Sequence, residues 1–184
     1  MKTQRKCFLT FFSLLLMIFV LMGMAPLVLA QAQEDSEPNN SCENAQNFGQ
    51  VELPFIVEGN LDENDVDFYR FQAPGGVAFI QVDLEGQAIE NGTPISDPLL
   101  GFFDSDCNLI AYNDDYLSLN SRLIIEVPSD GVLILAATLC GDFSFTGNHG
   151  GQGTYQMTLS RFAAIGSISG ATGMVDNELV KVQP

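Results

Sequence analysis

Short apolar segments recur along the chain from residue 55 onward, separated by clusters of Gly, Pro, Asn, Asp and Ser. Several alternate apolar and polar positions and are rich in β-branched and aromatic residues, which is the pattern of short β-strands. The segments predicted as strands are 55–61, 66–72, 77–84, 99–103, 109–112, 122–127, 131–138 and 154–160. They show no sustained helical periodicity. The pattern therefore predicts an all-β fold, an antiparallel β-sandwich or jelly roll of about eight strands.

The first 30 residues have the order of an export signal. Lys2, Arg5 and Lys6 form a positive start, residues 8–20 are almost wholly apolar, and small residues near position 30 offer cleavage sites. We therefore predict a protein secreted to the extracellular space or the periplasm, with residues 1–30 removed as a signal peptide. The uncharged run is also long enough to cross a bilayer, so retention of the signal as an anchor is the alternative.

Composition divides the rest of the chain into three parts. Residues 31–48 are rich in acidic and amide side chains and are predicted to be an acidic linker, with a possible short helix within 41–48. Residues 49–162 contain all of the predicted strands and form the β-sandwich domain. Residues 163–184 are either a tail or the start of an incomplete second module. The oligomeric state is left open.

The net charge narrows the choice of partners. The chain has 23 acidic and 7 basic residues, and three of the basic residues lie before position 30 while all of the acidic ones follow it. Loss of the signal therefore changes the net charge from −16 to −19. Such a protein is repelled by phosphate backbones and anionic membranes, so we expect no nucleic acid and no membrane partner after signal cleavage. The partner is predicted to be an unidentified extracellular polymer or protein.

Three cysteines follow the signal: Cys42, Cys107 and Cys140. An exported protein can form a disulfide, and three cysteines allow one bridge and one remaining thiol. The sequence does not choose among the three pairings. Their spacing is too wide for a zinc knuckle, so a zinc site is the weaker interpretation.

Two groups of oxygen-bearing side chains suggest a metal site. Both offer hard oxygen ligands in excess, which suits Ca²⁺ because that ion takes about 6–8 of them. An unpaired acidic segment would also repel itself, and a divalent ion would attach it to the sandwich. The candidate ligands are Asp35, Glu37, Asn39 and Asn40 in the first group and Asn64, Asp65 and Asp67 in the second.

A third group of acidic residues follows the middle of the chain. The segment Asp104 to Asn108 mimics an EF-hand loop, but Leu109 replaces the required Gly and no helix flanks it. We interpret it as a hairpin turn between two strands. The nearby residues Asp97, Asp114 and Asp115 are candidates for a second cation site at one end of the sandwich.

The sequence offers little support for catalysis. His149 is the only histidine, and it lies among glycines in what we interpret as a mobile loop. No zinc motif of the His-Glu-x-x-His type and no Gly-rich phosphate loop is present. We therefore predict that the protein is not an enzyme. A small hydrolase that uses unidentified carboxylates is the alternative.

Several motifs together resemble the bacterial pre-peptidase C-terminal domain, a family of small β-sandwich modules that includes the collagen-binding modules of bacterial collagenases. The resemblance covers residues 34–161 and rests on the order and spacing of all the motifs. They are Glu37-Pro-Asn-Asn-Ser41, Gly59-Asn-Leu61, Asp65-Val-Asp-Phe-Tyr-Arg-Phe71, Asp97-Pro-Leu-Leu-Gly-Phe-Phe-Asp104, Asn113-Asp-Asp115 and Gly153-Thr-Tyr155.

This resemblance implies that the acidic linker and the carboxylates beside the aromatic strand bind calcium. Asp67 and Asn64 would be the loop ligands, with Asp65 competing with Asn64 for its role. The collagen-binding aromatic residues of the relatives have no clear counterparts, so collagen binding is not implied.

Three functions remain open. The first is a noncatalytic, calcium-binding accessory module that aids stability, export or attachment. The second is a calcium-dependent carbohydrate- or matrix-binding domain of lectin type, with Tyr112, Tyr116 and Phe143 as contacts. The third is the small hydrolase.

Overall fold

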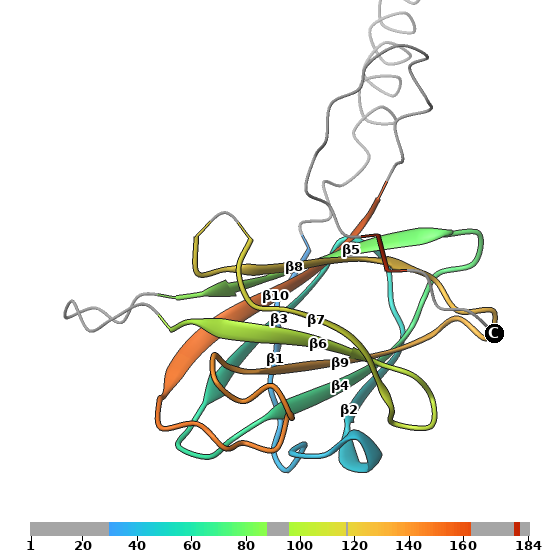
Figure 1. The fold of residues 1–184 in the computed structure, drawn as a ribbon. Helices are drawn as coiled ribbons and strands as arrows, with labels where there is room; N and C mark the ends of the chain where they lie inside the picture. Colours follow the sequence, from blue (N-terminus) through green and yellow to red (C-terminus); the bar gives the residue numbers. More distant parts are fainter. Residues whose placement is uncertain (1–29, 88–95, 117, 163–178, 181–184) are drawn as a thin grey trace, which may run out of the picture.

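The computed structural model describes residues 30–87, 96–116, 118–162 and 179–180. In this part of the chain two β-sheets pack face to face (Figure 1). Sheet A has the strand order β1-β3-β10-β5-β8-β11, and sheet B has the order β2-β4-β9-β6-β7. A short 3-10 turn, η1 (Cys42–Asn44), precedes β2. The strands are β1 (Gln33–Glu34), β2 (Gln46–Gln50), β3 (Phe55–Leu61), β4 (Asp67–Gln72), β5 (Phe79–Gly86), β6 (Pro98–Phe103), β7 (Leu109–Asn113), β8 (Ser121–Glu126), β9 (Val132–Leu139), β10 (Gly153–Arg161) and β11 (Leu179–Val180).

The predicted all-β sandwich is confirmed. Each of the eight predicted segments contains one strand, from β3 to β10, and their ends differ by at most two residues. These strands form the antiparallel orders β3-β10-β5-β8 and β4-β9-β6-β7, which is the arrangement of a jelly roll. The additional strands β1, β2 and β11 lie at sheet edges and pair in parallel with β3, β4 and β8.

Alternation along β4 explains why this part of sheet B is buried on both faces. Tyr69 and Phe71 point between the sheets and join the main core. Phe68, one position away, points to the opposite face and packs in a second apolar cluster with Leu99 and Phe145. A side chain of this size stabilises the fold by about 1.5–3 kcal/mol when it is fully buried. Both sets of β4 residues therefore contribute to stability, and the strand is fixed in register.

The outer face of sheet B is covered by two connecting segments. One is the β9–β10 loop, which supplies Phe145, and the other is the η1 segment, from which Cys42 and Ala45 pack against the same cluster. A disulfide joins Cys42 to Cys107 in the β6–β7 turn, with a Cα–Cα distance of 5.8 Å, and Cys140 is free. The structure thus selects one of the three pairings that the sequence left open.

The possible short helix within 41–48 is present only as one 3-10 turn, η1, and the rest of the segment begins a strand. The turn ends at Asn44, and residues Gln46–Gln50 form β2, which adds in parallel to the edge of β4. An eight-residue segment is too short for periodicity to separate helix from strand. Here the open edge of β4 provides the backbone partners. The supposed linker 31–48 therefore contributes an edge strand to each sheet.

The two ends of the chain are described only in part. Most of the predicted signal peptide, residues 1–29, lies outside the described residues. Within the predicted tail, residues 163–184, the structure describes only β11, which pairs with β8 at the edge of sheet A. Within the described residues, no helix combines the length and apolar character needed to cross a membrane.

Candidate metal centre

The segment between β1 and β2 crosses from one sheet to the other. β1 lies at the edge of sheet A, and β2 lies at the edge of sheet B. Two backbone hydrogen bonds attach the crossing segment to its surroundings. The Asp35 N–H donates to the Glu58 carbonyl at 2.9 Å, and the Phe68 N–H donates to the Asn39 carbonyl at 3.0 Å. The segment is therefore held at both ends, and its side chains lie beside the start of β4.

Three carboxylates that are distant in sequence meet at this crossing. Asp35 and Glu37 belong to the segment, and Asp67 is the first residue of β4. One oxygen of each lies within 4.8 Å of those of the other two. Asp67 is fully buried, Asp35 is half-buried and Glu37 is exposed. The group thus extends from the space between the sheets to the protein surface, which gives a small ion a path of entry.

Two tyrosines connect these carboxylates to the core. The Tyr155 hydroxyl donates to Asp67 Oδ2 at 2.6 Å, and the Tyr69 hydroxyl donates to Asp35 Oδ1 at 3.0 Å. The two hydroxyl oxygens also contact each other, and because each hydroxyl has a single proton, a hydrogen bond between them forms when protonated Asp67 donates to Tyr155. Because Tyr155 comes from sheet A and Tyr69 from sheet B, this network joins the two sheets and fixes the orientation of both carboxylates.

Two buried oxygens of the group, Asp67 Oδ1 and Asn39 Oδ1, have no hydrogen-bond partner among the described residues. Both side chains are 0% exposed. The Asn39 amide is oriented toward the group because its Nδ2 donates to Asp35 Oδ1 at 2.7 Å. Leaving a polar atom buried without a partner costs about 1–3 kcal/mol. Three converging carboxylates with a buried amide beside them offer the kind of oxygen ligands that Ca²⁺ prefers, so the donor set fits a calcium ion.

The electrostatics of the group also favour a cation. Burial raises the pKa of Asp67 to about 9, and the charges of Asp35, Asp65 and Glu37 act in the same direction. Burial likewise raises the pKa values of Asp35 and Glu37. Among the described residues, no Lys or Arg forms an ion pair with these carboxylates. The group therefore binds either a proton or a metal ion more favourably than an isolated carboxylate does.

The other predicted ligands lie beside this group. Asp65 is buried and accepts hydrogen bonds from Asn40 Nδ2 at 2.8 Å and from the Val66 N–H at 2.9 Å. It contributes negative charge to the site, but its Oδ1 is already engaged. Asn64 is exposed with a positive φ of 65°, and its side chain makes none of the hydrogen bonds described above. The structure thus brings Asn40 and Asp65 together next to the group and leaves Asn64 at the surface.

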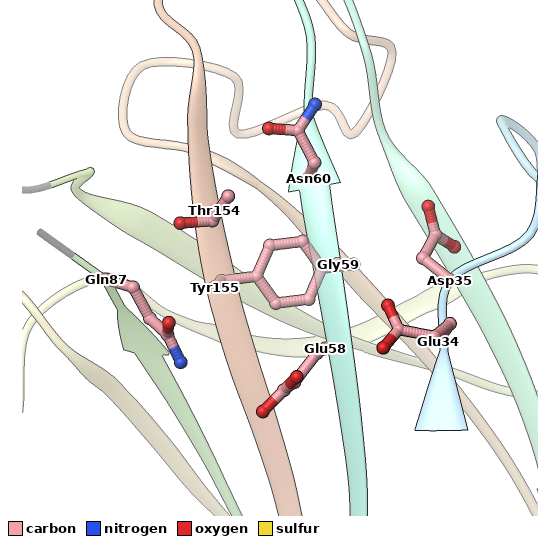
Figure 2. A pocket seen from close by; sticks show the side chains of 8 residues that line it. All are labelled: Glu34, Asp35, Glu58, Gly59, Asn60, Gln87, Thr154 and Tyr155. Carbon is pink, nitrogen blue, oxygen red and sulfur yellow. The ribbon is translucent and has the colours of Figure 1, made fainter. Parts of the chain in front are cut away.

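The sequence did not single out Tyr69, Tyr155 and Gly59 as parts of the site. Gly59 lies opposite Tyr155 in the β3–β10 pair, and a Cβ at this position would overlap the Tyr155 ring and hydroxyl. Figure 2 shows the ring next to Gly59, between β10 and β3. The missing side chain thus lets Tyr155 extend beneath β3 to Asp67. The signal was present in two of the family-like motifs, Gly59-Asn-Leu61 and Gly153-Thr-Tyr155.

A polar pocket of about 360 Å³ lies beside Gly59 and Tyr155 in sheet A. Figure 2 shows Asp35 at its rim, so the pocket and the candidate metal centre share this residue. The lining is mainly carboxylate, amide and hydroxyl side chains, and it therefore extends the negative potential of the site toward solvent. It consists of Glu34, Asp35, Glu58, Gly59, Asn60, Gln87, Thr154 and Tyr155.

Replacement of Gly59 by Ala is expected to destabilise the protein by about 1–3 kcal/mol, because the new methyl group displaces the buried Tyr155 ring. The measurement is urea denaturation of Gly59→Ala beside Gly75→Ala. A Cβ at Gly75 meets no atom within 4 Å, so that variant serves as the control. Equal stabilities for the two variants would contradict the role assigned to Gly59.

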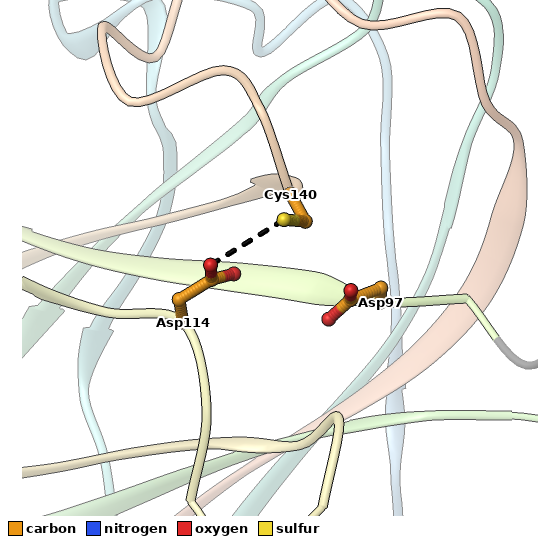
Figure 3. A group of neighbouring side chains, drawn as sticks. All are labelled: Asp97, Asp114 and Cys140. Atoms are coloured by element: carbon orange, nitrogen blue, oxygen red, sulfur yellow. Dashed lines mark hydrogen bonds between the residues drawn. The ribbon is translucent and has the colours of Figure 1, made fainter.

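The second predicted cation site has a different composition from the one expected. Asp97 and Asp114 come together with Cys140, and their ligand atoms lie within 4.8 Å of one another (Figure 3). The Cys140 thiol donates to Asp114 Oδ2 at 3.4 Å. Asp115 is exposed and is not part of this group, although its charge helps raise the pKa of Asp97, after burial and Asp114. The sequence missed Cys140 here because no local spacing links it to either acid.

Alkylation of Cys140 is expected to be slow at pH 8. Burial and the neighbouring Asp114 and Asp97 carboxylates raise the pKa of this thiol to about 11. The smaller thiolate fraction, partly offset by greater intrinsic nucleophilicity, lowers the rate about tenfold relative to an ordinary thiol. Iodoacetamide labelling followed by mass spectrometry measures this rate, and Asp114→Asn is expected to increase it. If wild type and Asp114→Asn react at the same rate, the carboxylate does not control the thiol.

The β9–β10 loop carries several internal and long-range hydrogen bonds. Asp142 accepts hydrogen bonds from the N–H groups of Thr146 at 2.9 Å and Gly147 at 2.7 Å. His149 is only 9% exposed, and its Nε2 lies 2.6 Å from the Asp65 carbonyl. The segment is a loop between β9 and β10, and these hydrogen bonds attach it to the rest of the fold. The buried hydrogen bonds give His149 a structural role.

The EF-hand-like segment is a hairpin turn, as predicted. Asp104 Oδ1 accepts hydrogen bonds from the N–H groups of Asp106 at 3.0 Å and Asn108 at 2.8 Å. These bonds close the connection between β6 and β7. The Asp104 oxygen is thus used to stabilise the turn.

Comparisons with known proteins add little to this description. No protein-family model matches the chain, and no curated protein matches it either. Among solved structures, the chain is similar to the crystal structure of Aeromonas hydrophila PliG, a periplasmic lysozyme inhibitor of g-type lysozyme. The match has 12% sequence identity and a TM-score of 0.39, and it covers 63% of this chain and 97% of PliG. A likeness at this level does not extend to function.

Proposed function

We propose that this chain is a secreted, noncatalytic β-sandwich module in which a calcium ion attaches the acidic N-terminal segment to the sandwich. The observation that carries the proposal is the fully buried Asp67, which has one oxygen without a partner and lies among Asp35 and Glu37. A buried carboxylate that is surrounded by negative charge and has no basic partner in the described residues is costly to ionise. A divalent cation removes this cost.

The ligands of the ion are proposed to be side-chain oxygens of Asp35, Glu37, Asn39 and Asp67. Asp65 adds charge close by but is engaged with Asn40. Calcium binding would compensate the repulsion among the carboxylates and would connect the crossing segment to β4. The ion thereby acts as a structural cross-link and does not participate in a reaction.

The family-like motifs support the same proposal. Under this proposal, the chain is a relative of the pre-peptidase C-terminal modules. Its site then corresponds to the calcium site that the resemblance implies. The charged N-terminal signal and the cysteine bridge support an exported location. The role of such a module is to stabilise, export or attach a larger assembly.

Calcium is expected to raise the melting temperature of the protein by roughly 6–10 °C when its concentration is about a hundredfold above the dissociation constant. The measurement is thermal unfolding in calcium and in EGTA, together with calorimetric titration. Asp67→Asn is expected to abolish the calcium response because it removes a charged ligand. Glu52→Gln removes one exposed charge away from the site and serves as the control. Identical melting of the wild type in calcium and in EGTA would refute the proposal.

A further inference from the structure

Exposed apolar side chains occur on β7, the strand at one edge of sheet B, and in two loops. Within the described part of the chain, the large exposed ones are Leu109, Ile110 and Tyr112 of β7, Leu119 in the loop after β7 and Phe143 in the β9–β10 loop, each 38–48% exposed. The rings of Tyr112 and Phe143 lie against each other, with centroids 5.6 Å apart. We call these five residues the β7 surface. Exposed apolar residues that are collected in one place indicate an interaction site more strongly than scattered ones.

The backbone of β7 is also available for pairing before Asn113, whose carbonyl accepts a hydrogen bond from the Ser121 hydroxyl. β7 is the last strand of sheet B, and no other strand of the described residues pairs with its outer edge. An open edge presents unpaired N–H and C=O groups, to which an extended peptide can add as a further strand. The five residues of β7 correspond to about 17 Å of extended chain. This length suits a short peptide segment.

Acidic residues flank β7 at both ends. Asp104 and Asp106 lie in the turn before the strand, and Asp114 and Asp115 follow it directly. Asp97 lies beside Asp114, and each of these two has a buried carboxylate oxygen without a hydrogen-bond partner in the described residues. Figure 3 shows both carboxylates directed toward the space next to Cys140. The edge therefore combines an apolar centre with negative ends.

No nearby basic residue balances this charge in the described part of the chain. Arg122, on β8, forms an ion pair with Asp83, and its guanidinium lies 4.2 Å from the centroid of the Tyr116 ring. The chain as a whole carries a net charge of −16.

A second copy of the chain is a poor occupant of this edge. Pairing two β7 strands brings acidic ends together whether the strands run parallel or antiparallel. The occupant that complements the edge must therefore be positively charged.

We propose that the β7 surface binds an extended, basic segment of another polypeptide by strand addition. Apolar side chains of the segment pack on Ile110, Tyr112 and Phe143, and its Lys or Arg side chains pair with Asp97 and Asp114. A free sugar or a small cation would leave either the open backbone edge or the apolar residues unused. The binding surface does not include the proposed calcium ligands Asp35, Glu37, Asn39 and Asp67, so the inference does not depend on calcium binding at that site.

The test uses synthetic ten-residue peptides in which Lys or Arg alternates with Val or Tyr, and full-length mature protein in calcium and in EGTA. Binding is measured by calorimetry. We expect binding of the basic peptide in both buffers and none of an analogue in which Glu replaces every basic residue. N-methylation along one edge of the peptide is expected to abolish binding, and methylation along the opposite edge is expected to preserve it. Equal binding of the two methylated forms, or no binding of the basic peptide, would overturn the proposal.

Two variants locate the site. Tyr112→Ser and Asp114→Asn are each expected to weaken binding about tenfold, and Glu52→Gln, which removes a charge elsewhere, is expected to leave it unchanged. Both altered side chains lie at the surface or partly exposed, and the melting temperature checks that each variant is folded. An equal effect of Glu52→Gln and Asp114→Asn would show nonspecific charge attraction and would overturn the assignment to β7. Loss of the calcium response with retained peptide binding would affect only the proposed function.

Discussion

Without calcium, the free energy of unfolding is expected to fall by about 3 kcal/mol between about pH 5.5 and 8, because folded Asp67 retains a proton that the unfolded chain releases. Burial raises the pKa of Asp67 from 3.8 to about 9. Between these two values the folded state binds more protons than the unfolded state. The stability of the protein is therefore greatest at low pH and is lost as the pH rises toward the pKa of the folded state.

Calcium is expected to remove most of this pH dependence. With the ion bound, Asp67 is ionised in the folded state as well as in the unfolded one, so neither state holds the proton. Stabilisation by calcium is consequently larger at pH 8 than at pH 5.5. Urea denaturation at several pH values, in EGTA and in calcium, measures both slopes.

Other carboxyl groups do not obscure this test. Burial also raises the pKa values of Asp35 and Glu37, which adds to the loss of stability in the same direction. The pKa of Asp142 is lowered in the folded state. Burial by itself would raise this pKa, but the hydrogen bonds from Gly147 and Ser144 outweigh the effect of burial. That carboxyl is ionised in both states throughout the chosen range.

Asp67→Asn is the matched variant because it keeps the size of the side chain and removes its titration. It is expected to show a much flatter pH profile in EGTA than the wild type. A wild-type profile that is flat in EGTA, or one that rises with pH, would show that Asp67 is not held in its protonated form.

Loss of the disulfide is expected to destabilise the protein by about 4 kcal/mol, the chain-entropy value for a closed loop of this size. Cys42 and Cys107 are 65 residues apart in sequence. The bridge also holds η1 against the β6–β7 turn, directly after Asn39 and Asn40. Calcium affinity is therefore expected to fall along with stability.

The measurement compares the double variant Cys42→Ser/Cys107→Ser with Cys140→Ser by urea denaturation and calcium titration. Cys140→Ser removes the free thiol and leaves the bridge in place, so it is expected to remain close to wild type. Peptide mapping that shows Cys140 in the disulfide, or equal stability of the two variants, would contradict this assignment.

Local sequence pattern was sufficient for the eight central strands. Their alternation and turn residues reflect which side of a strand meets the core, and that information lies within a few neighbouring positions. It was insufficient for residues 46–50, which form β2 directly after the 3-10 turn. The partner of β2 is the edge of β4, and such a long-range pairing leaves no clear mark in a short segment.

The candidate site likewise has features that the sequence revealed and features that it did not. The acidic groups around Asp35 and Asp67 were recognisable because hard oxygens are concentrated there, and the structure brings Asp35, Glu37 and Asp67 together. The tyrosine network and the space provided by Gly59 were not recognisable, because they depend on Tyr155 crossing from the other sheet. For the same reason the second group contains Cys140 in place of Asp115.

By itself, the sequence determined that the chain folds as a sandwich of short strands, and that its acidic residues fall into groups suited to a cation. Both are properties of neighbouring residues: alternation that matches the strand repeat, and density of charge. Only the tertiary structure decided which carboxylates meet, which cysteines pair and which strand edge remains open. Those outcomes depend on how the two sheets pack, because contacts between distant segments are set by the register and burial of whole strands.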